Sequence, residues 1–408
     1  MRPVDVTEPA PHLWFQARDT ARLIGPDGAD VPLAGVFQPV LPDRPGSTAV
    51  VAALSGQGQA FRIGGSGSLG AGPGCFETLT GGSLGGARRV VRTQASWLAS
   101  FAVNARLFGI GPGVRVAVPG RLSQSLALYA TLEGLCLGAE VHLLDGLRPD
   151  RMATAVAARR AEVIYATPVH LAQMLACGVA WPNLRLVLVG GAKLETGLRR
   201  ALAMAAPLAV VREFYGAAEA SFITLSGPED GTDTVGLPYP GVEVQICDAG
   251  GSGLPGGEPG EVWVRSPYLF LGYAGADPGT ARWRNGWLSV GEVGAMTPAG
   301  LVLRGRAGRM VTIAGQNVFP EEIERFMLGL DGVERAAVLS CADDRRGHVL
   351  HAVLMGDATR EQAILIAARA KLGPMVAPRR VIWRQDWPLL ASGKTDLQAL
   401  QAEATPWL

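Results

Sequence analysis

Residues 184–194 read LRLVLVGGAKL, a short apolar run that ends at a pair of glycines. The run has the length of a buried strand, and the glycines indicate a tight turn after it. The same pattern recurs from residue 93 to residue 210, where apolar strands alternate with helical segments. We expect helices over 93–108, 123–137, 149–160 and 169–177, and strands over 114–119, 139–145, 162–167 and 184–190. Strands that alternate with helices pair in parallel, so the sequence predicts an α/β fold with a mostly parallel sheet.

The pattern changes near residue 225. Short strands between Gly- and Pro-rich turns are expected over 242–248, 260–266, 286–291 and 301–305. They predict a small β subdomain over 225–303. A third section, with helices expected over 320–330 and 359–372, begins near residue 309 and ends in a polar tail. We therefore expect a large N-terminal domain (1–303), a hinge (304–308) and a small α+β C-terminal domain (309–408).

The composition argues against several classes of protein. The chain has 408 residues, of which 48% are hydrophobic and 18% charged, as in globular proteins. A net charge of +1 favours neither nucleic acid nor an anionic membrane as a partner. The five cysteines are scattered without a C-x-x-C pair, which fits a reducing, cytoplasmic setting. We expect no signal peptide and no membrane span. His348 and His351 fall in a strand pattern that sends them to opposite faces, which argues against a metal site there.

A glycine-rich stretch, TLTGGSLGGARRV, occupies residues 78–90. Glycines let backbone N–H groups turn toward an anion, hydroxyl groups add neutral donors, and arginine adds a charged fork. The combination suits a phosphate group. A flexible Gly/Ser connector is the alternative. The Walker pattern G-x-x-x-x-G-K-[ST] is absent.

Further short motifs follow in order along the chain. They are GGAKL at 190–194, EFYGAAEAS at 213–221, WLSVGEVG at 287–294, GRAGRMVTIAGQNVFPEEIE at 305–324 and LASGKTD at 390–396. Each is a weak signal alone, but their order and spacing are specific. Over about residues 78–400 the chain resembles the adenylate-forming superfamily of acyl-CoA synthetases, peptide-synthetase adenylation domains and luciferases. The resemblance implies a small C-terminal domain that rotates on a hinge, and activation of a carboxylic acid by ATP to an acyl-AMP.

The glycine-rich stretch is similar to the phosphate loop of that superfamily, T-S-G-S-T-G-x-P-K. The resemblance implies that ATP phosphates are bound by Thr80, Gly81, Gly82, Ser83 and Gly85. Arg88 stands where the family has lysine and is expected to act in catalysis. Leu84 and Ala87 replace a threonine and a proline, so some contacts to phosphate are absent.

The resemblance implies a nucleotide site as well. Tyr215 would stack on adenine against Gly191 and Ala192, and Glu219 would hold Mg²⁺. Glu292, in place of the usual Asp, and Arg306 would contact the ribose. Lys394 matches the mobile catalytic lysine, whose charge would offset charge developing at the carboxylate–phosphate junction. The alternatives are a surface helix start for Glu219, a solvated hairpin carboxylate for Glu292 and an ordinary solvated lysine for Lys394.

The stretch IAGQNVFPEEIE is most similar to the acyl-CoA synthetase branch. The resemblance implies that this loop approaches CoA after rotation of the small domain, with candidates Gly315, Gln316, Asn317 and Phe319. A plain strand, turn and helix start is the alternative. Gly216, Ala217 and Leu122 are candidates for the acyl pocket, Leu122 standing where a gating aromatic residue or histidine is common.

Two further departures concern the hinge and the N-terminal lobe. Gly308 occupies the usual hinge position, where the family has Asp or Lys. The segment before the phosphate loop is short, so a partner or a homodimer contact is expected to complete the lobe.

These observations predict an ATP-dependent acyl-CoA synthetase that uses Mg²⁺ and CoA. Its acid is expected to be apolar or aromatic, because no partner for a substrate ammonium group is evident at the sheet ends. Two alternatives stay open: loading of a carrier-protein thiol, and a catalytically silent nucleotide-binding scaffold.

Overall fold

A nine-stranded sheet dominates the computed structural model, which describes residues 13–80, 88–227, 234–275, 281–343, 347–390 and 394–404. Its six central strands are parallel, as predicted. In spatial order they are β11 (Val210–Ala217), β10 (Leu186–Val189), β9 (Val163–Ala166), β7 (Arg115–Val118), β8 (Glu140–Leu143) and β1 (Arg22–Ile24). Antiparallel strands extend both edges: β12 (Ser221–Leu225), β13 (Leu237–Pro238) and β2 (Asp30–Val31).

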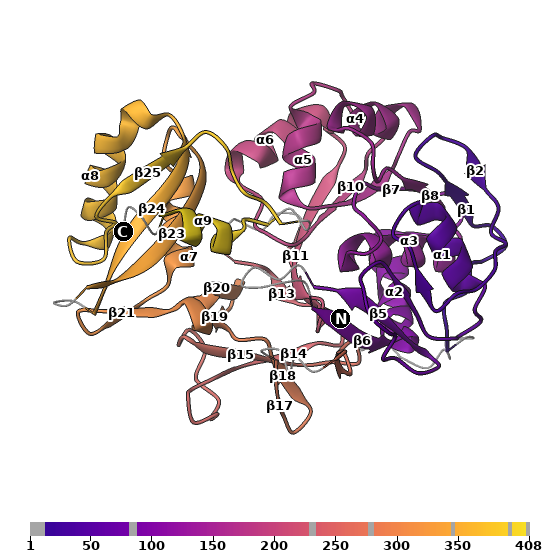
Figure 1. Cartoon of the computed structure of the whole chain (residues 1–408), viewed down its shortest axis with the longest axis horizontal. Coiled ribbons are helices and arrows are strands. Elements are labelled where there is room, and N and C mark those ends of the chain that lie inside the picture. The colour runs from indigo at the N-terminus through magenta and orange to yellow at the C-terminus, as the bar shows by residue number, and fades with distance from the viewer. Residues whose placement is uncertain are drawn as a thin grey trace.

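Helices cover both faces of the parallel strands (Figure 1). One face packs against α2 (Gln94–Phe108) and α3 (Ser125–Leu137), and the other against α4 (Pro149–Ala158), α5 (Pro168–Leu175) and α6 (Thr196–Ala205). Strand β9 shows why both faces are apolar: Tyr165 belongs to the first core and Ile164 to the second, because successive side chains point to opposite faces.

A second, five-stranded sheet is formed mostly by the N-terminal part of the chain, where the Pro- and Gly-rich sequence gives no clear strand pattern. It contains β3 (Val40–Leu41), β4 (Phe61–Ile63), β5 (Cys75–Leu79), β6 (Arg89–Thr93) and β16 (Gly272–Tyr273), with α1 (Gly46–Leu54) between β3 and β4. Strands β5 and β6 pair antiparallel and so bring the two ends of the glycine-rich stretch together. A fully buried ion pair, Arg62 Nη1 to Glu77 Oε2 at 2.7 Å, joins β4 to β5.

A third, six-stranded sheet confirms the strands expected after residue 225. Its members are β14 (Glu243–Cys247), β15 (Gly260–Arg265), β17 (Arg282–Arg284), β18 (Trp287–Ser289), β19 (Glu292–Thr297) and β20 (Gly300–Arg306). Strand β20 ends at Arg306, and a short 3-10 turn (Ala307–Arg309) follows it. The predicted hinge 304–308 therefore begins inside a paired strand, and the domain boundaries remain a prediction.

The C-terminal elements form a two-stranded and a three-stranded sheet with a core of their own, drawn in orange to yellow in Figure 1. They are β21 (Val311–Ile313), β22 (Gln316–Val318), α7 (Pro320–Leu328), β23 (Val333–Asp343), β24 (Gly347–Gly356), a 3-10 turn (Ala358–Arg360), α8 (Glu361–Leu372), β25 (Val381–Arg384) and α9 (Leu397–Ala404). The expected polar tail is wrong, since the end of the chain carries β25 and α9 and buries Leu400. In the parts of the chain described here, no helix is both long and apolar enough to cross a membrane.

Candidate active site

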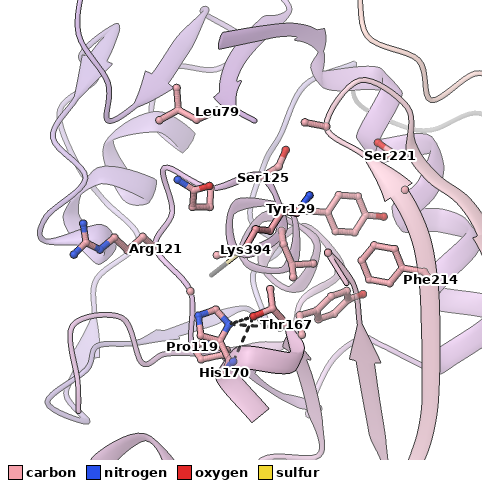
Figure 2. A pocket seen from close by; sticks show the side chains of 18 of the residues that line it. Leu79, Pro119, Arg121, Ser125, Tyr129, Thr167, His170, Phe214, Ser221 and Lys394 are labelled. Carbon is pink, nitrogen blue, oxygen red and sulfur yellow. Dashed lines mark hydrogen bonds between the residues drawn. The ribbon is translucent and has the colours of Figure 1, made fainter. Parts of the chain in front are cut away.

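Two adjoining cavities lie between the parallel sheet and the elements that surround it. The first has a volume of about 460 Å³ and is shown in Figure 2; the second has a volume of about 740 Å³. Among the described residues, four line both cavities: Gly191, Phe214, Gly216 and Lys394. The cavities are therefore neighbouring parts of one site.

The first cavity, which we call the aromatic cavity, has five Phe, Tyr and Trp rings in the part of its wall that the structure describes. They come from five different elements, α2, α3, β9, β11 and β12, and are Trp97, Tyr129, Tyr165, Phe214 and Phe222. Arg44, Arg121 and Lys394 also line it, whereas no carboxylate is among its described lining residues. The aromatic cavity therefore suits a ligand that is apolar and carries negative charge.

Backbone geometry at the end of β11 brings the two cavities together. Glu213 pairs with Val189 of β10, so the turn at Gly190–Ala192 lies beside Phe214 and the residues after it. Gly191 has φ +91°, a conformation that favours glycine. A Cβ on Gly216 would lie 2.1 Å from the carbonyl oxygen of Ser221 in the next strand. Small residues are therefore required where the backbone forms the cavity wall.

The second cavity collects the residues that the sequence predicted for adenine and ribose. Gly191, Ala192, Tyr215, Glu292 and Arg306 all line it. Glu292 on β19 and Arg306 on β20 are paired across the sheet, with Oε1 and Nε 3.1 Å apart. The Tyr215 hydroxyl is buried without a hydrogen-bond partner among the described residues. Its pKa lies well above the ordinary value because burial disfavours the phenolate, so Tyr215 is neutral.

Lys394 reaches this site from the far end of the chain (Figure 2). Its carbonyl accepts a hydrogen bond of 2.8 Å from the Leu390 N–H, which closes the segment before α9. Burial lowers the pKa of the Lys394 ammonium group and Arg306 lowers it further, whereas Glu292 and Glu219 act in the opposite direction. The lysine is thus within electrostatic range of three other predicted site residues.

The structure describes only the two ends of the predicted phosphate loop. The Thr80 N–H donates to the Arg88 carbonyl at 2.8 Å, and the Arg88 N–H donates to Thr80 Oγ1 at 3.1 Å. Thr80 is buried at the end of β5, where it closes the hairpin. Gly81, Gly82, Ser83 and Gly85 lie outside the described residues, as do Leu84 and Ala87.

Glu219 lies in a turn between β11 and β12, so its interpretation as the start of a surface helix is wrong. Its Oε1 accepts a hydrogen bond of 2.8 Å from the Tyr273 hydroxyl. The guanidinium carbon of Arg88 is 6.0 Å from the centre of the Tyr273 ring. Tyr273 therefore connects two predicted catalytic residues. Sequence reasoning missed it, because a single tyrosine 54 residues after Glu219 carries no spacing signal.

Five of the described candidates for acyl or CoA binding line neither cavity. Leu122 is fully buried in the core, whereas its neighbours Arg121 and Gln124 line the aromatic cavity. Gly315 forms the turn between β21 and β22 with φ +81°, and the adjacent Gln316 is exposed. Phe319 is buried, and the guanidinium carbon of Arg304 lies 5.0 Å from the centre of the Phe319 ring. Asn317 lies in β22 and also lines neither cavity, while Gly216 and Ala217 do line the aromatic cavity.

No cluster of three or more His, Cys, Asp or Glu side chains suited to a metal ion occurs within the described ranges. His348 lies on β24, a strand as expected. Any divalent cation in this site would therefore depend on one or two carboxylates together with ligand oxygens.

Comparisons with known proteins agree with this geometry. The family model described as "AMP-binding enzyme" matches residues 75–274, and the one described as "AMP-binding enzyme C-terminal domain" matches residues 322–394. The chain is 32% identical over 322 residues to the uncharacterised acyl-CoA ligase YhfT of Bacillus subtilis, with 78% of this chain and 66% of the relative covered.

A salicylyl-CoA synthase/salicylate adenylyltransferase of a Streptomyces species is 29% identical over 345 residues, covering 79% of this chain and 62% of that protein. Among solved structures, a variant of the amide bond synthetase McbA of Marinactinospora thermotolerans has a TM-score of 0.69 at 27% identity, covering 78% of this chain and 67% of that one. The chain thus spans slightly less than two thirds of the length of both curated relatives.

Proposed function

Because the chain belongs to the AMP-binding enzyme family, we propose that it activates a carboxylic acid with ATP and passes the acyl group to the thiol of CoA. The observation that carries this proposal is the position of Lys394 on the wall shared by the two cavities. One cavity is aromatic and free of described carboxylates, and the other is lined by Tyr215, Glu292 and Arg306. A lysine between an acid and a nucleotide lies where negative charge develops when the carboxylate attacks the α-phosphate.

In the first half-reaction a carboxylate oxygen of the acid attacks the α-phosphorus of ATP. The bond from that phosphorus to the oxygen that bridges to the β-phosphorus breaks, and pyrophosphate leaves with the electron pair. Lys394 offsets negative charge at the junction of the reacting groups, and Arg88 at the end of the phosphate loop does so for the departing phosphates. A carboxylate is already a nucleophile, so the step needs no general base.

The second cavity is the proposed nucleotide site. Adenine would lie between Tyr215 and the backbone at Gly191 and Ala192, and the ribose hydroxyl groups would meet Glu292 and Arg306. The ion pair between the last two holds both side chains in place before the nucleotide binds. Side chains that are already oriented before the nucleotide binds lower the entropic cost of aligning the reactants.

Glu219 fits the role of a magnesium ligand. It is a half-buried carboxylate with one oxygen held by Tyr273, and Mg²⁺ commonly binds one or two carboxylates together with substrate phosphates. When bound, the ion would neutralise charge on the phosphates. Tyr273 orients the carboxylate toward the end of the phosphate loop that carries Arg88.

We infer that the acid is aromatic. The five rings of the aromatic cavity offer the edge-on and offset contacts that aromatic groups prefer. Arg44 and Arg121 on the same lining favour an anion. The printed name of the Streptomyces relative includes an aromatic acid, salicylate, which agrees with this choice.

The acyl group is then passed to CoA. The thiolate sulfur attacks the acyl carbonyl carbon, and AMP leaves. We propose that residues 304–308 act as the hinge and that rotation brings Gly315, Gln316 and Phe319 toward the thiol. Arg304, in this segment, donates to both carboxylate oxygens of Glu322 on α7, at 2.8 and 3.1 Å. Rotation therefore has to break this ion pair.

Acid-dependent ATP–pyrophosphate exchange tests the proposal, with pools of aromatic, short-chain and long-chain acids. Exchange is expected with aromatic acids, and Lys394→Ala is expected to abolish it. Lys371→Ala is the matched control, because Lys371 is an exposed lysine of α8. Wild-type protein that binds ATP but exchanges with no acid would contradict the proposal and favour a silent nucleotide-binding scaffold. Addition of CoA or of a carrier protein to active enzyme then identifies the acceptor.

A further inference from the structure

Glu133 is a buried carboxyl group that the proposed chemistry does not use. It lies on α3 with its side chain fully buried, and no cation of the described residues forms an ion pair with it. One oxygen accepts a hydrogen bond from Asn104 Nδ2 at 2.8 Å, and the other accepts one from the Tyr165 hydroxyl. A buried carboxyl group without a counter-ion is costly. A leucine at this position would fill the same buried space without that cost. Glu133 therefore has a role other than packing.

Asn104 on α2 connects Glu133 to two further tyrosines. Its Nδ2 also donates to the Tyr129 hydroxyl at 3.2 Å, and its Oδ1 accepts from the Tyr239 hydroxyl at 2.7 Å. Ser100 Oγ, one helical turn earlier on α2, lies 2.8 Å from the Tyr129 hydroxyl. The Glu133–Asn104 pair therefore fixes the hydroxyl groups of three tyrosines.

Two of these tyrosines form part of the wall of the aromatic cavity. Tyr129, labelled in Figure 2, and Tyr165 both line the cavity, while their hydroxyl groups are bound to the polar network. The Tyr129 ring also packs edge-on against Trp97 and Phe222, with ring centres 5.1 and 5.4 Å apart. Because a tyrosine ring is rigid, a shift of its hydroxyl group moves the ring face that meets the ligand.

We propose that Glu133 is a positioning residue that holds Tyr129 and Tyr165 in the geometry required by a flat aromatic acid. It thereby sets the preference of the aromatic cavity for aromatic over alkyl acids. The inference rests on the proposed activation of an acid in this cavity. Ring-to-ring contacts are favourable only at particular angles and offsets, so they depend on walls that keep their place. An alkyl chain adapts to a wall that has shifted.

The experiment compares Glu133→Leu and Glu133→Gln with the wild-type enzyme in ATP–pyrophosphate exchange, with benzoate and hexanoate as probes. Leucine accepts no hydrogen bond, so the KM for benzoate is expected to rise about tenfold with a smaller change in kcat. The KM for hexanoate should change less than about threefold. Glutamine offers an acceptor to Asn104 and a donor to Tyr165, and should restore the wild-type KM. Glu258→Gln, at an exposed position, is the matched control.

A measurement without turnover separates this inference from the proposed function. Near-ultraviolet circular dichroism reports the fixed packing of tyrosine and tryptophan rings. The signal is expected to weaken in Glu133→Leu and to persist in Glu133→Gln. If the wild-type protein exchanges with no acid, the proposed function is wrong, and this spectrum alone decides whether Glu133 positions the wall.

Three outcomes would overturn the inference. One is an unchanged benzoate KM together with an unchanged spectrum in Glu133→Leu. Another is an equal rise in KM for both acids, which indicates a general loss of structure. Should Glu133→Leu fail to fold, Tyr165→Phe removes the hydroxyl group that donates to Glu133. The third outcome that would overturn the inference is an unchanged ratio of the benzoate KM to the hexanoate KM in Tyr165→Phe.

Discussion

Replacement of Glu133 by glutamine should change how the stability of the protein depends on pH. Burial raises the pKa of Glu133 from 4.5 to about 7, against the smaller lowering effect of hydrogen bonds from Tyr165, Asn104 and Tyr129. The folded protein therefore keeps a proton on this group up to about pH 7, whereas the unfolded chain releases it near 4.5. Since the folded state binds more protons in this window, the free energy of unfolding falls as the pH rises through it.

The size of the effect follows from the two pKa values. Linkage between them removes roughly 2.5 kcal/mol of stability from the wild-type protein between about pH 5 and about pH 8. Neighbouring titratable groups do not compete, because burial raises the pKa of Cys136 to about 12 and the pKa values of Tyr129, Tyr165 and Tyr239 above their ordinary range. These four side chains stay neutral over the whole range from about pH 5 to about pH 8. Glutamine resembles the protonated carboxyl group and cannot titrate.

The assay is urea unfolding of wild-type and Glu133→Gln proteins at several pH values, followed by tryptophan fluorescence. The two proteins should be similarly stable near pH 5, and the variant should be the more stable by about 2.5 kcal/mol near pH 8. Glu258→Gln, at an exposed glutamate, should follow the wild-type protein at every pH. A difference between wild type and Glu133→Gln that does not change with pH would refute the reasoning.

Three further substitutions test other parts of the structure. Arg62→Ala removes the fully buried partner of the Glu77 carboxylate and leaves it only the longer 3.4 Å contact with Arg89 and the Gly70 N–H, so it should lower the free energy of unfolding by about 2 kcal/mol, measured by urea unfolding. Tyr273→Phe removes the hydrogen bond to Glu219, so exchange should fall about tenfold and require more Mg²⁺, measured by magnesium titration. Gly216→Ala places a Cβ 2.1 Å from a backbone oxygen of the next strand, so acid-dependent exchange should be lost and stability should fall by about 1–3 kcal/mol.

Each of these substitutions has an informative comparison. Arg148→Ala breaks an exposed pair and should cost less than about 1 kcal/mol, so an equal cost for Arg62→Ala would contradict the burial argument. Gly197→Ala lies in α6, where no described atom beyond its own helix backbone comes within 4 Å of the new Cβ, and should be tolerated where Gly216→Ala is not. An unchanged magnesium dependence in Tyr273→Phe would contradict the proposed metal ligand.

Hydrophobic pattern predicted the parallel sheet because β9 and β10 are uninterrupted apolar runs that alternate with helices. β9 and β10 fall inside the predicted ranges 162–167 and 184–190, and α2 begins one residue after the predicted start. In the second sheet, no sequence signal marked β3 and β4 because they are two and three residues long. Strands so short show no periodicity, and they exist only because neighbouring strands complete their hydrogen bonds.

The order of motifs along the sequence by itself determined the family and the residues proposed to bind nucleotide. Glycine-rich turns and a charged residue at fixed offsets can be recognised without knowledge of packing. Only the tertiary structure decided that Lys394 lines both cavities and that Tyr273 contacts Glu219. It likewise decided that Tyr129 lines a cavity, because a buried aromatic residue has the same pattern in a helix whether it faces other side chains or a ligand. Contacts between residues distant in sequence depend on how the sheets pack, which no local pattern records.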